Sequence, residues 1–147
     1  MNETPINFQR ALDDYIQYFE KLNARSIRLI EKIAAPGIRF KDPFNDVQGV
    51  DAFERIFEHM FANIDSPKFE VQDYAWGKEG HTAYLRWVLH YKLKGQSRRI
   101  DGMSEVMFSK DGKLMSHIDH WDAGEQFYEH IPVLGALIRF VKSKLEI

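Results

Sequence analysis

Along the first part of the chain, apolar residues recur three and four positions apart, which is the spacing of one face of an α-helix. This spacing predicts a helix over residues 5–22, and Thr4-Pro5 is a suitable start for it. A second predicted helix, about 25–35, ends at the breaker pair Pro36-Gly37. The third predicted helix, about 51–64, has an apolar face made by Phe53, Ile56, Phe57, Met60, Phe61 and Ile64.

Between the second and third helices, a short run of alternating residues predicts a strand over 38–42. The alternation puts Ile38, Phe40 and Asp42 on one face of that strand. Pro43 ends it, and we predict a loop over 43–49 before the third helix.

From residue 68 onward, the repeat of apolar positions shortens to two, which is typical of strands. It predicts four strands, joined by turns that include Gly95-Gln96 and Asp111-Gly112, at about 68–76, 81–94, 98–109 and 113–122. A short helical turn at 125–130 and an amphipathic helix at about 132–146 then end the chain. Strands grouped after helices favour an α+β fold with an antiparallel sheet, in a single domain over 1–147.

The two predicted turns decide which side chains share a face of the sheet. One face is apolar apart from Ser104, His117 and Asp119, which fall on adjacent positions. Ionisable groups on a buried face need partners or a wet cavity. Two interpretations stay open: His117 and Asp119 hydrogen-bond each other at the edge of the core, or the cluster belongs to an aromatic-lined pocket. A register shifted by one residue would instead turn both side chains to the surface.

The opposite face of the sheet mixes charged residues with apolar ones, including Tyr84, Val88, Met103 and Met107. A half-apolar exposed face indicates a homodimer interface, and a solvated face with scattered apolar residues is the alternative.

Composition narrows the possible functions. The chain has 147 residues, of which 44% are hydrophobic and 14% aromatic, and this is typical of one compact folded domain. Absence of cysteine excludes disulfides and cysteine chemistry, and a net charge of −2 argues against nucleic acid as the main partner. No apolar run is long enough to cross a membrane, and the N-terminal residues lack the features of a signal peptide, so we expect a cytoplasmic protein. We expect no cofactor and no metal, because alternation sends His117 and His120 to opposite faces.

Two motifs carry a resemblance to a known family. The run Ile38-Arg39-Phe40-Lys41-Asp42-Pro43-Phe44, followed by Gly49, resembles the nuclear transport factor 2-like superfamily. The stretch 106–114 and the Trp121-Asp122 pair are similar to it as well, especially to its SnoaL-like and ketosteroid isomerase-like branch. The resemblance implies a cone-shaped, curved, mostly antiparallel sheet wrapped around the N-terminal helix. This cystatin-like α+β roll would enclose a deep apolar pocket.

The resemblance also implies roles for individual residues. Asp42 matches the base of the isomerase, and an ungapped match places the oxyanion donor on Tyr18. Ser104 stands where the isomerase has a protonated Asp. His117 and Asp119 match the acid–base arrangement of SnoaL-like cyclases.

These observations predict a protein that binds a small apolar ligand and is an isomerase or cyclase. It would act by proton transfer on a hydrophobic carbonyl compound. The expected catalytic residues are Asp42, Tyr18, His117 and Asp119, and the expected pocket residues are Phe57, Trp87, Leu89, Ser104 and Trp121.

Several alternatives remain open. The protein would otherwise be a non-catalytic binding protein for an apolar metabolite, or a dimeric interaction module with a vestigial pocket. For Asp42, the alternative is an ordinary aspartate hydrogen-bonded within a turn. We expect the C-terminal helix to cap the cone or pack on the sheet, with a membrane surface as the alternative, and Tyr128 to Pro132 to form part of a lid.

Overall fold

The computed structural model describes residues 6–126 and 132–146. The predicted helix start at Thr4-Pro5, and the predicted lid at 128–131, lie outside these residues. The fold is α+β, as predicted, with a curved, open, six-stranded sheet of order β2-β1-β6-β5-β4-β3. Its elements are α1 (Phe8–Glu20), η1 (Ile27–Leu29), α2 (Ile30–Ile33), β1 (Ala34–Lys41), β2 (Asp46–Gln48), α3 (Val50–Asn63), β3 (Asp65–Trp76), β4 (Thr82–Leu93), β5 (Gln96–Phe108), β6 (Leu114–His120), α4 (Ala123–Gln126) and α5 (Pro132–Leu145).

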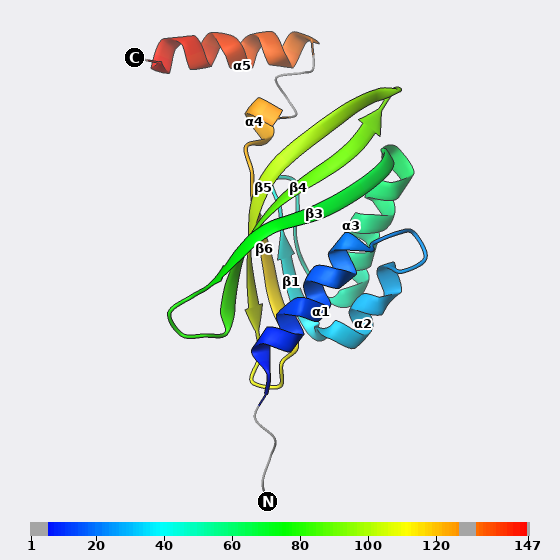
Figure 1. Ribbon diagram of the computed structural model, residues 1–147. Helices are drawn as coiled ribbons and strands as arrows, with labels where there is room; N and C mark the ends of the chain where they lie inside the picture. Colours follow the sequence, from blue (N-terminus) through cyan, green and yellow to red (C-terminus); the bar gives the residue numbers. More distant parts are fainter. Residues whose placement is uncertain (1–5, 127–131, 147) are drawn as a thin grey trace, which may run out of the picture.

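The strands β3 to β6 form the predicted antiparallel meander, and helices α1 to α3 lie together on one side of the curved sheet (Figure 1). β1 pairs with β6 in parallel, which is the one parallel pairing among the described strands. This pairing brings Phe40 beside His117. The sheet therefore places a residue from the first half of the chain next to the polar cluster of the last strand.

The helical part before the sheet is shorter than predicted. Helix α1 begins at Phe8, because the side chain of Asn7 caps it by accepting a hydrogen bond from the Arg10 backbone N–H at 3.1 Å. The second predicted helix is only η1 and α2, and β1 begins at Ala34. Pro36 therefore lies inside a strand, where the pairing with β6 is irregular and no N–H is needed. The predicted loop 43–49 contains the short strand β2.

Both predicted turns differ in detail from the structure. The β4–β5 turn is Lys94-Gly95, both with positive φ, so Trp87 pairs with Gly102 and not with Ser104. This register differs from the predicted one by two residues, and a shift of two leaves every side chain on its predicted face.

At the β5–β6 hairpin, Ser104 pairs with Asp119 and Val106 with His117, as predicted. A bulge between Met107 and Phe108 then pairs Phe108 with Leu114. Leu114 is therefore fully buried, whereas Met115, predicted to face the core, is 42% exposed.

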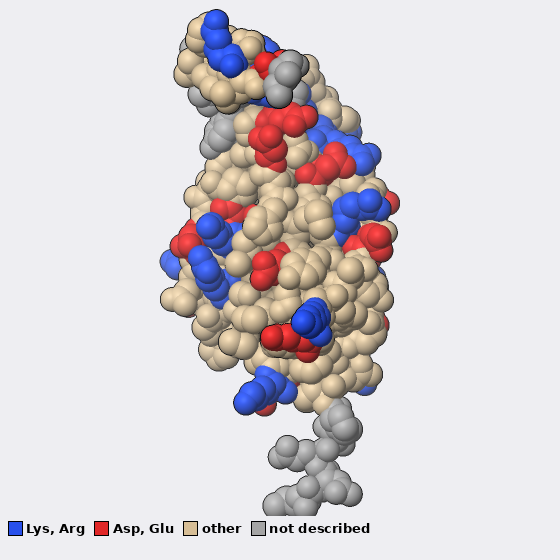
Figure 2. Space-filling model, turned by 90° about the vertical axis from the view of Figure 1, so that its left-hand side faces the viewer, with Lys and Arg blue, Asp and Glu red and all other residues tan. Residues whose placement is uncertain are grey.

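The C-terminal helix α5 lies beyond one end of the sheet (Figure 1). Three of its apolar side chains, Leu137, Phe140 and Leu145, are between 58% and 77% exposed. These three side chains therefore do not pack on the sheet, contrary to the expectation that the apolar face of this helix does so. In residues 6–126 and 132–146, no helix has the length and apolar character needed to cross a membrane. On the face shown in Figure 2, acidic and basic side chains are interspersed, in keeping with the net charge of −2.

Candidate functional site

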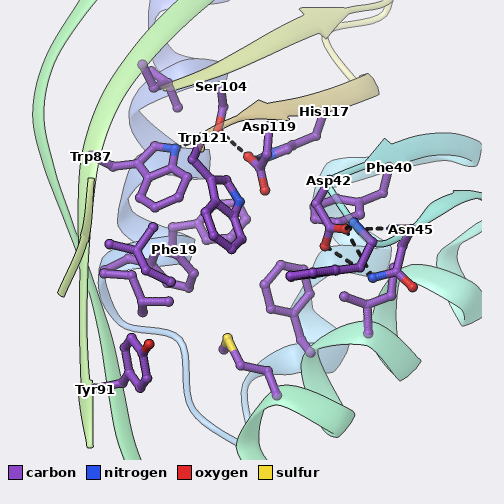
Figure 3. A pocket seen from close by; sticks show the side chains of 18 of the residues that line it. Phe19, Phe40, Asp42, Asn45, Trp87, Tyr91, Ser104, His117, Asp119 and Trp121 are labelled. Carbon is purple, nitrogen blue, oxygen red and sulfur yellow. Dashed lines mark hydrogen bonds and ion pairs between the residues drawn. The ribbon is translucent and has the colours of Figure 1, made fainter. Parts of the chain in front are cut away.

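A cavity of about 230 Å³ lies between the inner face of the sheet and helices α1 and α3 (Figure 3). It is larger than the ~150 Å³ cavity that accommodates benzene in a well-studied case. Its wall is mostly aromatic and aliphatic, and the aromatic part consists of Phe19, Phe40, Phe44, Phe57, Phe69, Trp87, Tyr91 and Trp121. The five predicted pocket residues all line it, namely Phe57, Trp87, Leu89, Ser104 and Trp121. Asp42, His117 and Asp119 line it as well, and Tyr18 does not.

Four residues of the cavity wall, Trp87, Ser104, Asp119 and His117, belong to one chain of hydrogen bonds. The Trp87 indole N–H donates to Ser104 Oγ at 2.7 Å, and the Ser104 hydroxyl donates to Asp119 Oδ1 at 2.5 Å (Figure 3). His117 Nε2 lies 2.5 Å from the same oxygen, and His117 Nδ1 lies 2.6 Å from the Tyr15 hydroxyl. Because an indole N–H can only donate, Ser104 must accept from Trp87 and direct its own proton to Asp119.

The Tyr15 hydroxyl fixes the tautomer of His117. Tyr15 is fully buried, and this burial raises the pKa of its phenol well above the usual value of 10. The phenol therefore keeps its proton, and among the described residues that proton has one acceptor, His117 Nδ1. His117 is then neutral and carries its hydrogen on Nε2, which donates to Asp119. Phe40, stacked on the imidazole at 5.0 Å between ring centroids, helps to hold the ring in place.

These contacts leave one oxygen of Asp119 without a hydrogen bond to any described residue. Oδ1 accepts from both Ser104 and His117, whereas Oδ2 points into the cavity (Figure 3). The Asp119 side chain is 13% exposed. Asp119 thus presents a single oriented oxygen to whatever enters an apolar space, and this is the geometry required of a general base or acid.

Asp42 also lines the cavity, but its carboxylate is occupied. Oδ1 accepts from the backbone N–H groups of Phe44, at 2.8 Å, and Asn45, at 2.7 Å. The Asn45 side-chain amide lies 3.1 Å from Oδ1 and 3.2 Å from Oδ2. Asp42 is therefore hydrogen-bonded within a turn, as in the alternative stated for it above, and it also contributes to the cavity wall.

Tyr18 lies outside this site, contrary to the role predicted for it. Its hydroxyl donates to the Ile27 backbone carbonyl at 2.8 Å, so it holds η1 against α1. The tyrosine that reaches the polar cluster is Tyr15, one turn earlier, which lies in the stripe of apolar residues that predicts the first helix. A signal was present, since a buried phenol in such a stripe needs a polar partner on the face that it packs against.

Two further donors face the cavity without a partner among the described residues. The Trp121 indole N–H and the Tyr91 hydroxyl line the cavity, and neither makes a hydrogen bond within 6–126 and 132–146. Burial raises the pKa of the Tyr91 phenol. Both groups therefore remain available to donate to a ligand.

Metal coordination finds no support in the described part of the chain, which has no group of three or more acidic or histidine side chains able to hold an ion. His120, exposed, pairs with Met103 at the end of β6, whereas His117 is buried in the core.

Replacement of Tyr15 by phenylalanine is expected to remove the hydrogen bond at His117 Nδ1. The variant leaves Nδ1 without a donor in a buried position, so we expect a loss of about 1–3 kcal/mol in the free energy of unfolding. In ¹⁵N NMR spectra, we expect the Nδ1 signal of His117 to shift, because it loses its donor, while the hydrogen stays on Nε2, where Asp119 accepts it. Tyr18→Phe is the matched control, because it removes a buried phenol that does not touch His117. Unchanged His117 signals in Tyr15→Phe would contradict this assignment.

Comparison with known proteins adds an independent result. The family described as SnoaL-like domain matches residues 15–117 of the chain. No curated protein matches the sequence.

Several solved structures share the fold. An NTF2-like protein of unknown function from Exiguobacterium sp. 255-15 has a TM-score of 0.66 at 20% identity, covering 76% of this chain and 98% of that one. The epoxide hydrolase/cyclase-like enzyme SalBIII has a role in pyran ring formation in the polyether salinomycin. Its structure has a TM-score of 0.67 at 16% identity, and the match covers 78% of this chain and 92% of that one. An LEH-like epoxide hydrolase from M. tuberculosis has a TM-score of 0.66 at 12% identity, and the match covers 99% of both chains. At these identities, the likeness is one of fold.

Proposed function

The chain belongs to the SnoaL-like domain family, and we propose that its cavity binds a small, mostly apolar molecule on which Asp119 acts by proton transfer. The observation that carries this proposal is the arrangement of Asp119. Its Oδ1 is held by Ser104 and His117, and its Oδ2 faces an aromatic cavity. A positioned acid or base contributes typically ~10²–10⁴-fold to a rate.

The reaction that this arrangement suits best is removal of a proton next to a carbonyl group. Asp119 Oδ2 takes the proton from carbon, and the electron pair moves onto the carbonyl oxygen as an enolate. The Trp121 indole N–H is the cavity donor that we assign to stabilise this oxygen, in place of Tyr18. With a β,γ-unsaturated ketone, return of the proton from Asp119 to the γ-carbon gives the conjugated isomer. Attack of the enolate on a second carbonyl of the same molecule closes a ring instead, and the alkoxide that forms takes the proton back from Asp119.

Two of the solved structures with this fold are described as enzymes that act on small molecules. SalBIII is described as epoxide hydrolase/cyclase-like, and the M. tuberculosis protein as an LEH-like epoxide hydrolase. We choose isomerisation or cyclisation over hydrolysis because the one free carboxylate oxygen lies in an apolar space, where a carbon acid is better accommodated than water.

Deuterium exchange tests the catalytic part of the proposal. A panel of small cyclic ketones is incubated with the protein in D₂O, and loss of the α-proton signals is followed by ¹H NMR. At least one member is expected to exchange faster than with acetate at the same concentration, because acetate supplies the same carboxylate without the cavity. Ketones that bind in the cavity without any acceleration would contradict catalysis and favour the non-catalytic binding protein.

We also propose that two copies of the chain pair through the outer face of the sheet. Tyr84 is 43% exposed and Met103 is 49% exposed on this face, at opposite corners of a square completed by Arg86 and Glu105. Rotation of a second copy by 180° about the Tyr84–Met103 diagonal sets each Arg86 opposite the other copy's Glu105. The square is thus complementary to itself in charge, which is what a two-fold interface requires.

A charge swap tests this pairing. Arg86→Glu is expected to weaken the dimer at least about tenfold, because it faces two acidic residues towards each other across the interface. The double variant Arg86→Glu with Glu105→Arg is expected to restore it. Molar mass by light scattering over a range of concentrations measures both effects. A wild-type chain that remains a monomer at high concentration would contradict the proposal, and Met115→Glu, on the exposed side of β6, is the control substitution.

A further inference from the structure

We infer that the molecule held in this cavity carries a positively charged nitrogen, and that the cavity rejects anions. The inference rests on the proposed function only in taking the cavity as the ligand site. It concerns which chemical class of small molecule enters, and it is carried by the charge and the aromatic character of the lining.

The charged groups of the lining are all acidic. Among the described residues that line the cavity there is no lysine and no arginine, whereas Asp42 and Asp119 both contribute carboxylates. A carboxylate or phosphate on a ligand would enter without any cationic partner, and burying an unpaired anion near two others is costly. The lining therefore disfavours anionic metabolites.

The histidines of the lining do not offset these carboxylates. His117 accepts a hydrogen bond from Tyr15 at Nδ1, so it is the neutral tautomer, and its Nε2–H is used by Asp119. His59, the second histidine of the lining, is exposed to solvent on α3. The charge inside the cavity is thus negative, and a protonated amine is the group that would balance it.

The aromatic wall favours the same class of ligand. Five phenylalanines, two tryptophans and one tyrosine line the cavity, so eight rings surround a small space. A cation over the face of an aromatic ring is attracted by the negative charge of that face, and the gain is greatest for tryptophan and in sites away from water. Trp87 and Trp121, both in the wall, supply such faces beside Asp119 (Figure 3).

The size of the cavity limits the ligand further. The cavity volume of about 230 Å³ is smaller than the ~300–1,000 Å³ common for pockets that bind drug-sized ligands. One ring with a short alkylammonium group fits such a volume, whereas a steroid-sized molecule does not. The site is thus suited to a tertiary or quaternary amine on a single ring.

Three probes of similar shape test the inference: benzyltrimethylammonium, its uncharged isostere neopentylbenzene, and the anion hydrocinnamate. Binding is measured from the fluorescence of the wild-type protein and by NMR. We expect benzyltrimethylammonium to bind at least about tenfold more tightly than neopentylbenzene, and hydrocinnamate to bind least. Asp119→Asn is expected to remove much of this preference, while Asp111→Asn, in an exposed turn, is expected to retain it.

The outcomes separate this inference from the proposed function. Equal or tighter binding of neopentylbenzene would overturn the preference for a cation while leaving the cavity as a ligand site. Tighter binding of hydrocinnamate would overturn the rejection of anions. Failure of all three probes to bind would overturn both the inference and the proposed function.

Discussion

Replacement of Asp119 by asparagine is expected to slow proton exchange on a bound ketone by about 10²–10⁴-fold, with little change in ligand affinity for an uncharged ligand. The asparagine carbonyl oxygen can still accept from Ser104 and His117, so the hydrogen-bond chain is kept. Its amide nitrogen takes the place of Oδ2 and cannot accept a proton. The measurement is the exchange rate by ¹H NMR at saturating ketone.

Asp42→Asn is the informative comparison for this prediction, since the family resemblance assigns the base to Asp42. We expect a smaller loss from it, because both oxygens of Asp42 already accept hydrogen bonds from the turn that it forms. Asp111→Asn, in an exposed turn, is the control for loss of one negative charge. Exchange that survives in Asp119→Asn and disappears in Asp42→Asn would contradict our assignment and favour the one implied by the resemblance.

Replacement of Gly102 by alanine is expected to cost roughly 3 kcal/mol in the free energy of unfolding, with overpacking and loss of a buried hydrogen bond contributing together. A Cβ atom at Gly102 would lie within 2.5 Å of the six-membered ring of Trp87, which packs directly over this position. Trp87 must then move, and its bond to Ser104 is broken. Urea denaturation followed by fluorescence measures the loss, and the displaced indole is also expected to obstruct the cavity.

Gly37→Ala is the matched control for this change. It also adds one methyl group to a glycine in a strand, but nothing lies within 4 Å of the position of its Cβ. We expect a change below about 0.5 kcal/mol for it, as for a surface substitution away from special features. Equal stability of the two variants would show that Trp87 has room to move and that Gly102 does not determine its position.

Much of the sheet could be predicted because its information is local. Alternation of apolar and polar residues assigns side chains to the two faces of the sheet. This assignment is correct although the predicted β4–β5 turn is not, because the register differs by two residues and not by one. Ser104, His117 and Asp119 were therefore recognised as neighbours on the inner face from sequence alone. The bulge at Phe108 could not be predicted in the same way, because an extra residue in one strand leaves no periodic signal.

The tyrosine of the site was missed for a different reason. An ungapped match counted back from Asp42 selects Tyr18, but the direction in which each side chain of α1 points depends on how this helix packs, and only the tertiary structure shows that. Tyr15 turns towards His117, and Tyr18 turns towards Ile27. The hydrogen bonds that the Asp42 carboxylate accepts depend on the turn at Asn45, and the spacing of apolar and polar residues does not predict them either.

The parallel pairing of β1 with β6 has a consequence for the order in which the site forms. Strands β3 to β6 are neighbours in sequence, so their hairpins close short loops, whereas Phe40 and His117 are 77 residues apart (117 − 40). Contacts of such long sequence separation carry the largest loop-closure cost and are slow to form. The stacking of Phe40 on His117 is thus expected to be among the last events of folding, and the cavity to form only when the two halves of the chain have met.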